Sequence, residues 1–424
     1  MQRKFGLLLI LVALTTIVSC HHVKPKVFDP SLVDFEATYN PYLENQFYPS
    51  LVMGVAGLSD KNFGNNDTNA LFTVSVTAPA SNSVLRITID SSNLNYVTIF
   101  QEVLPVKDMR YTFHPSVKWK YDKLYLIRQQ GTADLTFTCY INDEEVDVKN
   151  VRINYRSAND CLLSVLDSEG KLHDFRWLFA AYVNEEHPFI DSILTDIMSQ
   201  GVVSKITGYQ KDAKSVVQQV EAIWYYALER GISYSSISCT SSPTERANVQ
   251  HIRFFDQVYN TRQANCVDAC VFFASIMRKI GLKPVIFVEP CHAYLGYYTD
   301  NHRRKLQLME TTMTSWVDFP ALTRNYNETM QNNPQAKGAE RISAAMNAKY
   351  TKYLSAADKK RWEEGTLSFE SFKRAVAHTI FVKATDYDKE NYKNNRKYFT
   401  NSSNPTYQQL DIELLRKMVQ PING

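Results

Sequence analysis

Residues 263–270 read Gln-Ala-Asn-Cys-Val-Asp-Ala-Cys, and they lead into an apolar stretch that continues to Ile280. Apolar side chains recur there at helical spacing and Gly281 follows as a stop signal, which predicts a helix over 265–280. Short runs rich in β-branched and aromatic residues come next, at 284–288, 294–298 and 305–310. A helix followed by antiparallel strands indicates an α+β fold class for this part of the chain.

Three reactive residues fall within this segment. Cys266 lies where the helix should begin, His292 lies at the second strand, and Glu310 lies at the end of the third. A helix N-terminus favours a thiolate nucleophile, a histidine can take the thiol proton, and a carboxylate can orient the histidine. Glu310 is one hairpin away from His292, whereas Asp300 falls in the predicted turn and Asp318 lies beyond the strand. We therefore expect the three catalytic residues to be Cys266, His292 and Glu310.

A thiol nucleophile also needs donors for the developing oxyanion. The backbone N–H of Cys266 is one, because the first N–H groups of a helix have no intrahelical acceptor. A side-chain amide upstream is a second candidate. The sequence offers Gln250, Gln257 and Gln263 for this role and does not choose among them.

The same residues allow other interpretations. Cysteine is among the most buried residue types, so Cys266 could belong to the core, and Cys270 is the default structural thiol. Together with Cys291 and His292 these residues could suggest zinc. The spacing argues against it, because no Cys-x-x-Cys pair is present and adjacent strand residues point to opposite faces. We expect no metal and no cofactor.

The segment resembles the transglutaminase-like, papain-related superfamily in its bacterial branch. The resemblance covers roughly residues 175–320 and is carried by the following pieces: Arg-Gly-Ile-Ser-Tyr at 230–234, Ile-Arg-Phe-Phe-Asp-Gln-Val at 252–258, Asn-Cys-Val-Asp at 265–268, Gly-Leu-Lys-Pro-Val-Ile at 281–286 and His-Ala-Tyr at 292–294. It implies a papain-like core with Cys266 as nucleophile, His292 as base and Glu310 as the orienting residue. The family more often has aspartate at the third position, and the glycine common before the histidine is Cys291 here.

The resemblance implies acyl transfer or hydrolysis at peptide or protein amide bonds through a thioester. Hydrolysis is favoured over cross-linking for an anchored envelope protein. The alternative is a binding or scaffold protein that keeps the fold without turnover, since fold does not fix function.

The rest of the chain divides by composition. Residues 67–156 show short alternating runs typical of an immunoglobulin-like β-sandwich, and the transglutaminase-like core is expected at 157–324. The strands expected in the sandwich are 71–76, 84–89, 123–127, 135–141 and 146–153. Helices are expected at 175–183, 189–198 and 214–230 in the core, and at 339–354, 357–364 and 369–378 in a helical flank over 325–424.

The first residues predict a targeting segment. Arg3 and Lys4 precede an apolar run at 5–17, which is too short for a comfortable membrane span. Ile-Val-Ser-Cys at 17–20 resembles a lipoprotein signal, so we expect a leader over 1–19, lipidation at Cys20 and an anchor and tether over 20–66. An anchored, periplasm-facing protein of the bacterial envelope is favoured. The net charge is +3, and the sequence has no basic stripe that would indicate nucleic-acid binding.

Overall fold

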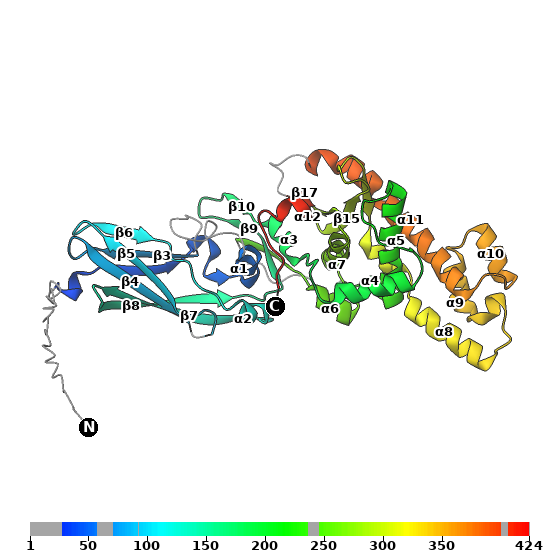
Figure 1. Ribbon diagram of the computed structural model, residues 1–424, viewed down its shortest axis with the longest axis horizontal. Helices are drawn as coiled ribbons and strands as arrows, with labels where there is room; N and C mark the ends of the chain where they lie inside the picture. The colour runs from blue at the N-terminus through cyan, green and yellow to red at the C-terminus, as the bar shows by residue number, and fades with distance from the viewer. Residues whose placement is uncertain (1–27, 57–70, 92, 236–245, 400–405, 424) are drawn as a thin grey trace, which may run out of the picture.

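The computed structural model describes residues 28–56, 71–91, 93–235, 246–399 and 406–423. The fold is α+β with several separate sheets, as expected. The molecule is elongated (Figure 1): two β-sheets form one end, a mixed sheet-and-helix region lies in the middle, and helices α8 (Phe319–Asn332), α9 (Ala344–Thr351) and α10 (Ala356–Glu363) form the other end. The predicted leader and Cys20, the predicted lipidation site, lie outside the described residues.

Two sheets pack against each other in the first part of the chain. The larger has the order β2-β8-β7-β4-β5, with β2 at Gln46–Phe47, β8 at Glu144–Tyr155, β7 at Gly131–Ile141, β4 at Ser83–Asp90 and β5 at Thr98–Leu104. The smaller has the order β1-β3-β6, with β1 at Phe35–Tyr39, β3 at Phe72–Thr77 and β6 at Arg110–Phe113. Aromatic rings close the space between them, since the ring centroids of Phe72 and Phe137 are 5.4 Å apart. Alternating burial along β3 and β4 matches the sequence pattern.

Two expectations for this part were wrong. Residues 123–127 were expected to form a strand, but helix α2 spans Tyr121–Tyr125 and buries Leu124. The described residues of the expected tether at 20–66 pack into the structure instead, because β1 pairs with β3 and the helix α1 (Pro49–Val55) is buried along its whole length.

A four-stranded antiparallel sheet carries the predicted hairpins. Its order is β16-β15-β14-β17, with β16 at Leu306–Met309, β15 at His292–Tyr298, β14 at Pro284–Glu289 and β17 at Gln408–Asp411. One face, with Ile286 and Leu295, belongs to the main core. The other face, with Phe287 and Tyr294, forms a second cluster with the ring of Phe399. Both faces are therefore covered, the first by α7 (Cys266–Lys279) and the second by α11 (Phe369–Phe399).

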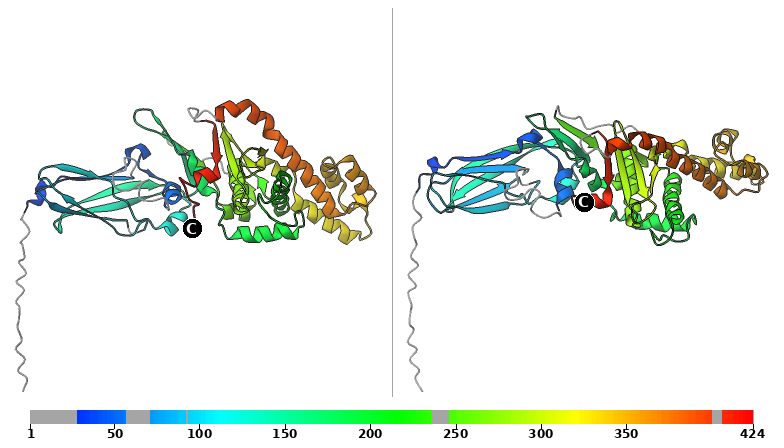
Figure 2. Two further views of the ribbon diagram at one scale, coloured as in Figure 1. Left: turned by 45° about the horizontal axis from the view of Figure 1, so that its top comes forward. Right: turned by 90° about the horizontal axis from the view of Figure 1, so that it is seen from above.

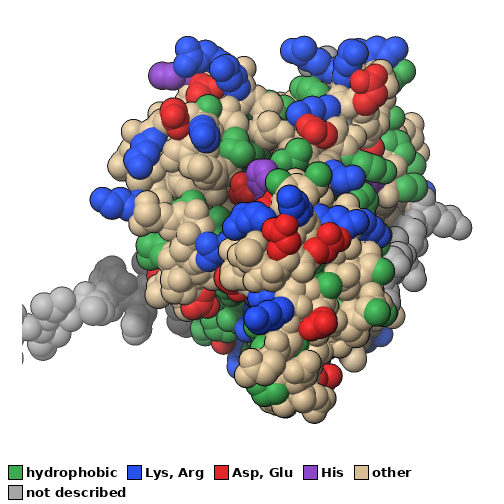
Figure 3. Space-filling view, turned by 90° about the vertical axis from the view of Figure 1, so that its right-hand side faces the viewer, with side chains coloured by type: hydrophobic (Ala, Val, Ile, Leu, Met, Phe, Trp, Pro, Cys, Tyr) green, Lys and Arg blue, Asp and Glu red, His purple; other side chains and the backbone are tan. Residues whose placement is uncertain are grey.

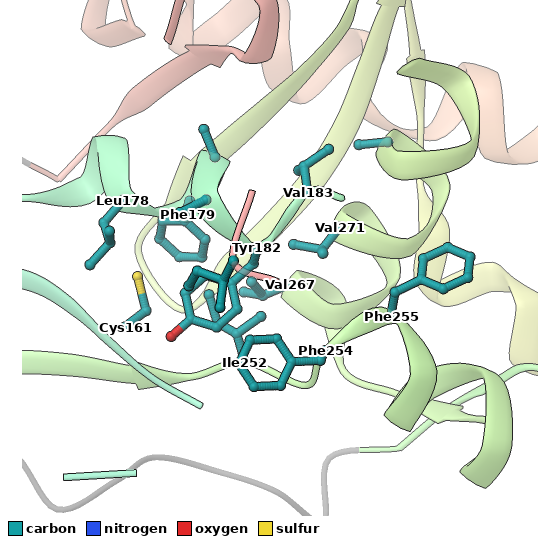
Figure 4. Packing of buried hydrophobic residues seen from close by; sticks show 14 of the residues in the cluster. Cys161, Leu178, Phe179, Tyr182, Val183, Ile252, Phe254, Phe255, Val267 and Val271 are labelled. Carbon is teal, nitrogen blue, oxygen red and sulfur yellow. The ribbon is translucent and has the colours of Figure 1, made fainter. Parts of the chain in front are cut away.

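The helix α7 is held by a dense core. Figure 4 shows its Val267 and Val271 beside Tyr182 of α3 (Phe179–Tyr182) and beside the segment with Ile252 and Phe254. The predicted helix at 214–230 is confirmed as α5 (Ala213–Arg230), which ends at Gly231 with a φ of 76°. The prediction at 189–198 is confirmed as α4 (Phe189–Ser199). A three-stranded sheet of β10 (Leu172–Asp174), β9 (Asp160–Leu166) and β12 (Ala247–His251) was not predicted.

The last hundred residues are mainly helical, as expected, but they do not only flank the core. The helix α11 extends far beyond the predicted 369–378 and runs along the four-stranded sheet that carries His292 (Figure 2). After it, β17 joins the sheet edge at β14, and the chain then returns to the first half, where the N–H of Gln420 donates to the carbonyl of Gly54 at 2.7 Å. Lys and Arg side chains are interspersed with Asp and Glu on the end of the molecule that faces the viewer in Figure 3. No helix among the described residues is long and apolar enough to cross a membrane.

Candidate functional site

A reciprocal capping box fixes the start of α7. The side-chain oxygen of Asn265 accepts from the N–H of Asp268 at 2.8 Å, and the carboxylate of Asp268 accepts from the N–H of Asn265 at 3.0 Å. Cys266 is consequently the first residue of the helix, where the macrodipole favours a negative charge. Because Cys266 is the first residue of α7, its backbone N–H has no acceptor within the helix.

Asp268 also ties the helix to the preceding segment. Its carboxylate accepts from the backbone N–H of Arg253 at 2.7 Å and from the guanidinium of Arg253 at 3.0 Å. The side chain is fully buried, and this burial raises the pKa of Asp268 in spite of the hydrogen bonds. The sequence did not predict a role for either residue. The signal for Asp268 was present, because an Asn followed three residues later by an acidic residue is a capping-box pattern.

His292 is placed by a tight hairpin. It faces Glu289 across the turn between β14 and β15, so both side chains lie on the same face of the sheet. Cys291, in the turn, has a φ of 63°, a conformation that glycine adopts most easily. This explains why a glycine would be favoured at the position before the histidine.

His292 joins the other two predicted residues in one hydrogen-bonded chain. Its Nε2 lies 2.8 Å from Oε2 of Glu310, and its ring also hydrogen-bonds to the thiol of Cys266, for which Nδ1 remains. The hydrogen bond with Cys266 and then the one with Glu310 raise the pKa of His292 to about 10. The structure thus brings together Cys266, His292 and Glu310, which come from a helix and two strand ends.

The surroundings of Glu310 favour its charged form. Burial by itself raises its pKa, but hydrogen bonds from His292 and Thr312 outweigh the burial and lower it below the usual value. Its second carboxylate oxygen accepts from the N–H of Thr312 at 2.8 Å and from the hydroxyl of the same residue. Its own backbone N–H donates to the carbonyl of Ala384 on α11 at 2.9 Å. The carboxylate is therefore fixed from two sides.

A cavity of about 580 Å³ opens beside this chain of residues. It lies between the end of the sheet, the 3₁₀ helix η4 (Thr311–Trp316) and α11, and Cys266 is not among the residues that line it. The lining residues are Glu289, His292, Glu310, Thr312, Met313, Trp316, Tyr387 and Asn391. The imidazole of His292 thus contacts the thiol and also borders the cavity.

The proposed oxyanion glutamines are placed differently from one another. The side-chain oxygen of Gln257 accepts from the N–H of Phe254 at 2.8 Å and from the amide of Asn159 at 2.6 Å, so this residue has a structural task and the structure gives no support for its expected role. The amide of Gln250 donates to the carbonyl of His251 at 2.9 Å. Gln263 is exposed in β13 (Gln263–Ala264), and its role stays a prediction.

The other described thiols differ in their surroundings. Cys139 and Cys161 are buried and free rather than bridged, and burial raises the pKa of both, that of Cys139 to about 12. Cys270 is buried with its sulfur 3.8 Å from the hydroxyl of Thr311, which suits a structural thiol. Cys291 is exposed in its turn. Within the described ranges, no group of three or more His, Cys, Asp or Glu is arranged to hold a metal ion.

Comparison with models of protein families gives no match, and comparison with curated protein sequences gives no significant match. Membership in the transglutaminase-like superfamily is therefore a proposal that rests on the residues and their geometry.

Proposed function

We propose that this protein is a cysteine acyl-transfer enzyme of the transglutaminase-like, papain-related superfamily. The observation that carries the proposal is the hydrogen-bonded chain from Cys266 through His292 to Glu310. A helix and two strand ends contribute to it, and this geometry supports the role expected for each residue from the family. The four-stranded sheet has α7 on one face and α11 on the other, and this arrangement supports a papain-like core. The two packed sheets at the other end of the molecule support an immunoglobulin-like sandwich.

The reaction can be followed proton by proton. His292 takes the proton of the Cys266 thiol at Nδ1, and the resulting imidazolium is stabilised by Glu310 at Nε2. The sulfur attacks the amide carbon, and the free N–H of Cys266 at the helix start can donate to the oxyanion. The C–N bond then breaks as His292 gives its proton to the leaving amine, which leaves a thioester on Cys266. A water or an amine attacks the thioester, loses its proton to His292 and releases the sulfur.

We further propose that the substrates are peptide or protein amides, with hydrolysis ahead of cross-linking. The leader and the cysteine at position 20 support an anchored lipoprotein of the bacterial envelope, facing the periplasm. A protein substrate fits an open site, because Cys266 is partly exposed and the adjacent cavity has exposed aromatic rings at its rim.

Cysteine-resolved labelling tests the proposal. The purified protein is treated with limiting iodoacetamide between about pH 4 and pH 9, and each cysteine peptide is quantified by mass spectrometry. We expect Cys266 to react faster than the exposed Cys291, although it is less accessible, and His292→Ala to abolish this advantage. His378→Ala is the matched control, because His378 pairs with Glu221 at 2.7 Å on the exposed side of α11 and contacts no described thiol through a hydrogen bond. If Cys266 is no more reactive than the exposed Cys291, the enzyme proposal fails and a binding or scaffold role takes its place.

A further inference from the structure

The cavity beside His292 has an unbalanced charge. Two carboxylates line it, those of Glu289 and Glu310. In the described part of the chain, Glu310 has His292 as its ionic partner, whereas Glu289 forms an ion pair with no Lys or Arg. When His292 is protonated, it balances one of the two negative charges, so the cavity keeps a net negative charge.

Neutral donors hold the carboxylate of Glu289 in place. Its two oxygens accept from the side-chain amides of Asn391 at 2.8 Å and Asn395 at 3.4 Å, and Asn395 also donates to Asn391 at 2.8 Å. Amide donors fix the direction of the carboxylate and bring no positive charge to it. Glu289 is therefore an oriented anion at the edge of the cavity, with capacity for further donors.

Two aromatic rings complete the walls. Tyr387 is 64% exposed and Trp316 is 39% exposed, although large aromatic side chains are usually buried to a greater extent. Both line the same cavity as Glu289. A carboxylate together with accessible ring faces is a combination that binds organic cations, since the ring quadrupole and the carboxylate attract the same charge.

The chemistry of the proposed reaction places this cavity on one side of the substrate. His292 must protonate the leaving amine, so the leaving group lies on the His292 side of the scissile amide. The cavity borders His292 and does not include Cys266. A ligand in the cavity consequently belongs to the leaving-group half of the substrate, or to the acceptor that replaces it.

We propose that this cavity is a cation-binding subsite, which selects peptide substrates with a positively charged Lys-like or Arg-like side chain on the leaving-group side. Glu289 is its specificity residue, Tyr387 and Trp316 are its walls, and Asn391 positions the carboxylate. The inference rests on the proposed cysteine chemistry but is not required by it. The bound cation is distinct from an attacking amine, because an amine must be uncharged to act as a nucleophile.

Charged thiol reagents test the subsite without a known substrate. The purified protein is treated with three alkyl methanethiosulfonates: 2-aminoethyl, which is cationic, propyl, which is neutral, and 2-sulfonatoethyl, which is anionic. The rate at Cys266 is measured by peptide mass spectrometry and is divided by the rate of each reagent with free cysteine. We expect the cationic reagent to exceed the anionic one by about tenfold at low salt, and the ratio to fall as salt is added.

Two variants and one control assign the selectivity. Glu289→Gln should bring the ratio close to one, and Tyr387→Leu, at an exposed ring that the fold does not need, should lower it by a smaller factor. Glu328→Gln makes the same charge change at an exposed position on α8, and it should leave the ratio unchanged. If Cys266 reacts rapidly but the ratio is one in the unmodified protein, or is unaffected by both Glu289→Gln and Tyr387→Leu, the subsite is refuted and the enzyme proposal stands. If Cys266 does not react even with the neutral reagent, both proposals fall.

Discussion

Replacement of Asp268 by alanine should damage both the fold and the candidate site. The carboxylate accepts three hydrogen bonds, from the backbone N–H groups of Asn265 and Arg253 and from the guanidinium of Arg253. Asp268 is completely buried, so water cannot take the place of the carboxylate. The change leaves two backbone donors unsatisfied and a largely buried guanidinium without its partner.

The magnitude follows from these contacts. Loss of an N-terminal helix cap costs about 1 kcal/mol, and removal of one partner of a buried ion pair costs about 3–5 kcal/mol. Burial already offsets part of the hydrogen-bond energy, as the raised pKa of Asp268 indicates. We therefore expect a loss of about 4 kcal/mol in the free energy of unfolding. Asp268→Asn keeps the shape and one acceptor oxygen, so it should cost about half as much.

Urea denaturation of the purified variants measures this loss, and iodoacetamide labelling measures the effect on Cys266. We expect labelling of Cys266 to slow in Asp268→Ala, because loss of the capping box leaves the start of α7, and with it the thiol beside His292, without its hydrogen bonds. The control is Asp318→Ala, which removes an exposed cap with a single hydrogen bond to the N–H of Ala321 and should cost about 1 kcal/mol. Equal losses in the two variants, or unchanged labelling of Cys266 in Asp268→Ala, would refute the reasoning.

Three further perturbations follow from the same geometry. His292→Gln should destabilise the protein most below about pH 6.5, and the difference in stability from the unmodified protein should shrink as the pH rises through about 10. The reason is that the raised pKa of His292 adds stability only where the ring is protonated in the folded state. Thermal melts that show a constant difference across this pH range would contradict the prediction. Cys291→Gly should raise the free energy of unfolding by up to about 1 kcal/mol, since it removes a side chain from a φ of 63°, and a measured loss would argue against strain in the turn. Gly296→Ala should cost about 1–3 kcal/mol, because the new Cβ would lie 2.8 Å from a ring carbon of Phe287; denaturation curves that coincide with the unmodified protein would show that the ring can move away.

Local signals predicted the elements that carry the candidate residues. The helix at 265–280 has an N-cap, a periodic apolar face and a terminal glycine, and the structure has α7 at Cys266–Lys279. The hairpin strands are fixed by short loops, so their order along the chain is also their order in the sheet. The elements that carry Cys266, His292 and Glu310 could therefore be predicted from the sequence.

Non-local pairing could not be predicted in the same way. The strand β9 pairs with β12, which lies more than eighty residues later, and β17 joins β14 after a long helical excursion. Neither strand has a turn signal that points to its partner. The expected strand at 123–127 failed for a related reason: its alternating apolar residues are used by a short helix that buries Leu124 and places the ring of Tyr125 4.9 Å from that of Phe254. Tertiary contacts thus overrode the local pattern.

The candidate site also depends on residues beyond the expected boundary at 324. The backbone of Glu310 is held by Ala384, and the carboxylate of Glu289 is held by Asn391, both on α11. Residues 325–424 were expected to form a helical flank, but a long helix needs only a narrow apolar stripe to cover a sheet, and α11 places the rings of Tyr392 and Phe399 against Phe287. The strand β17 then completes the edge of the same sheet by pairing with β14. The expected core and the expected flank therefore form one structural unit, and the chemistry proposed for Cys266 depends on both.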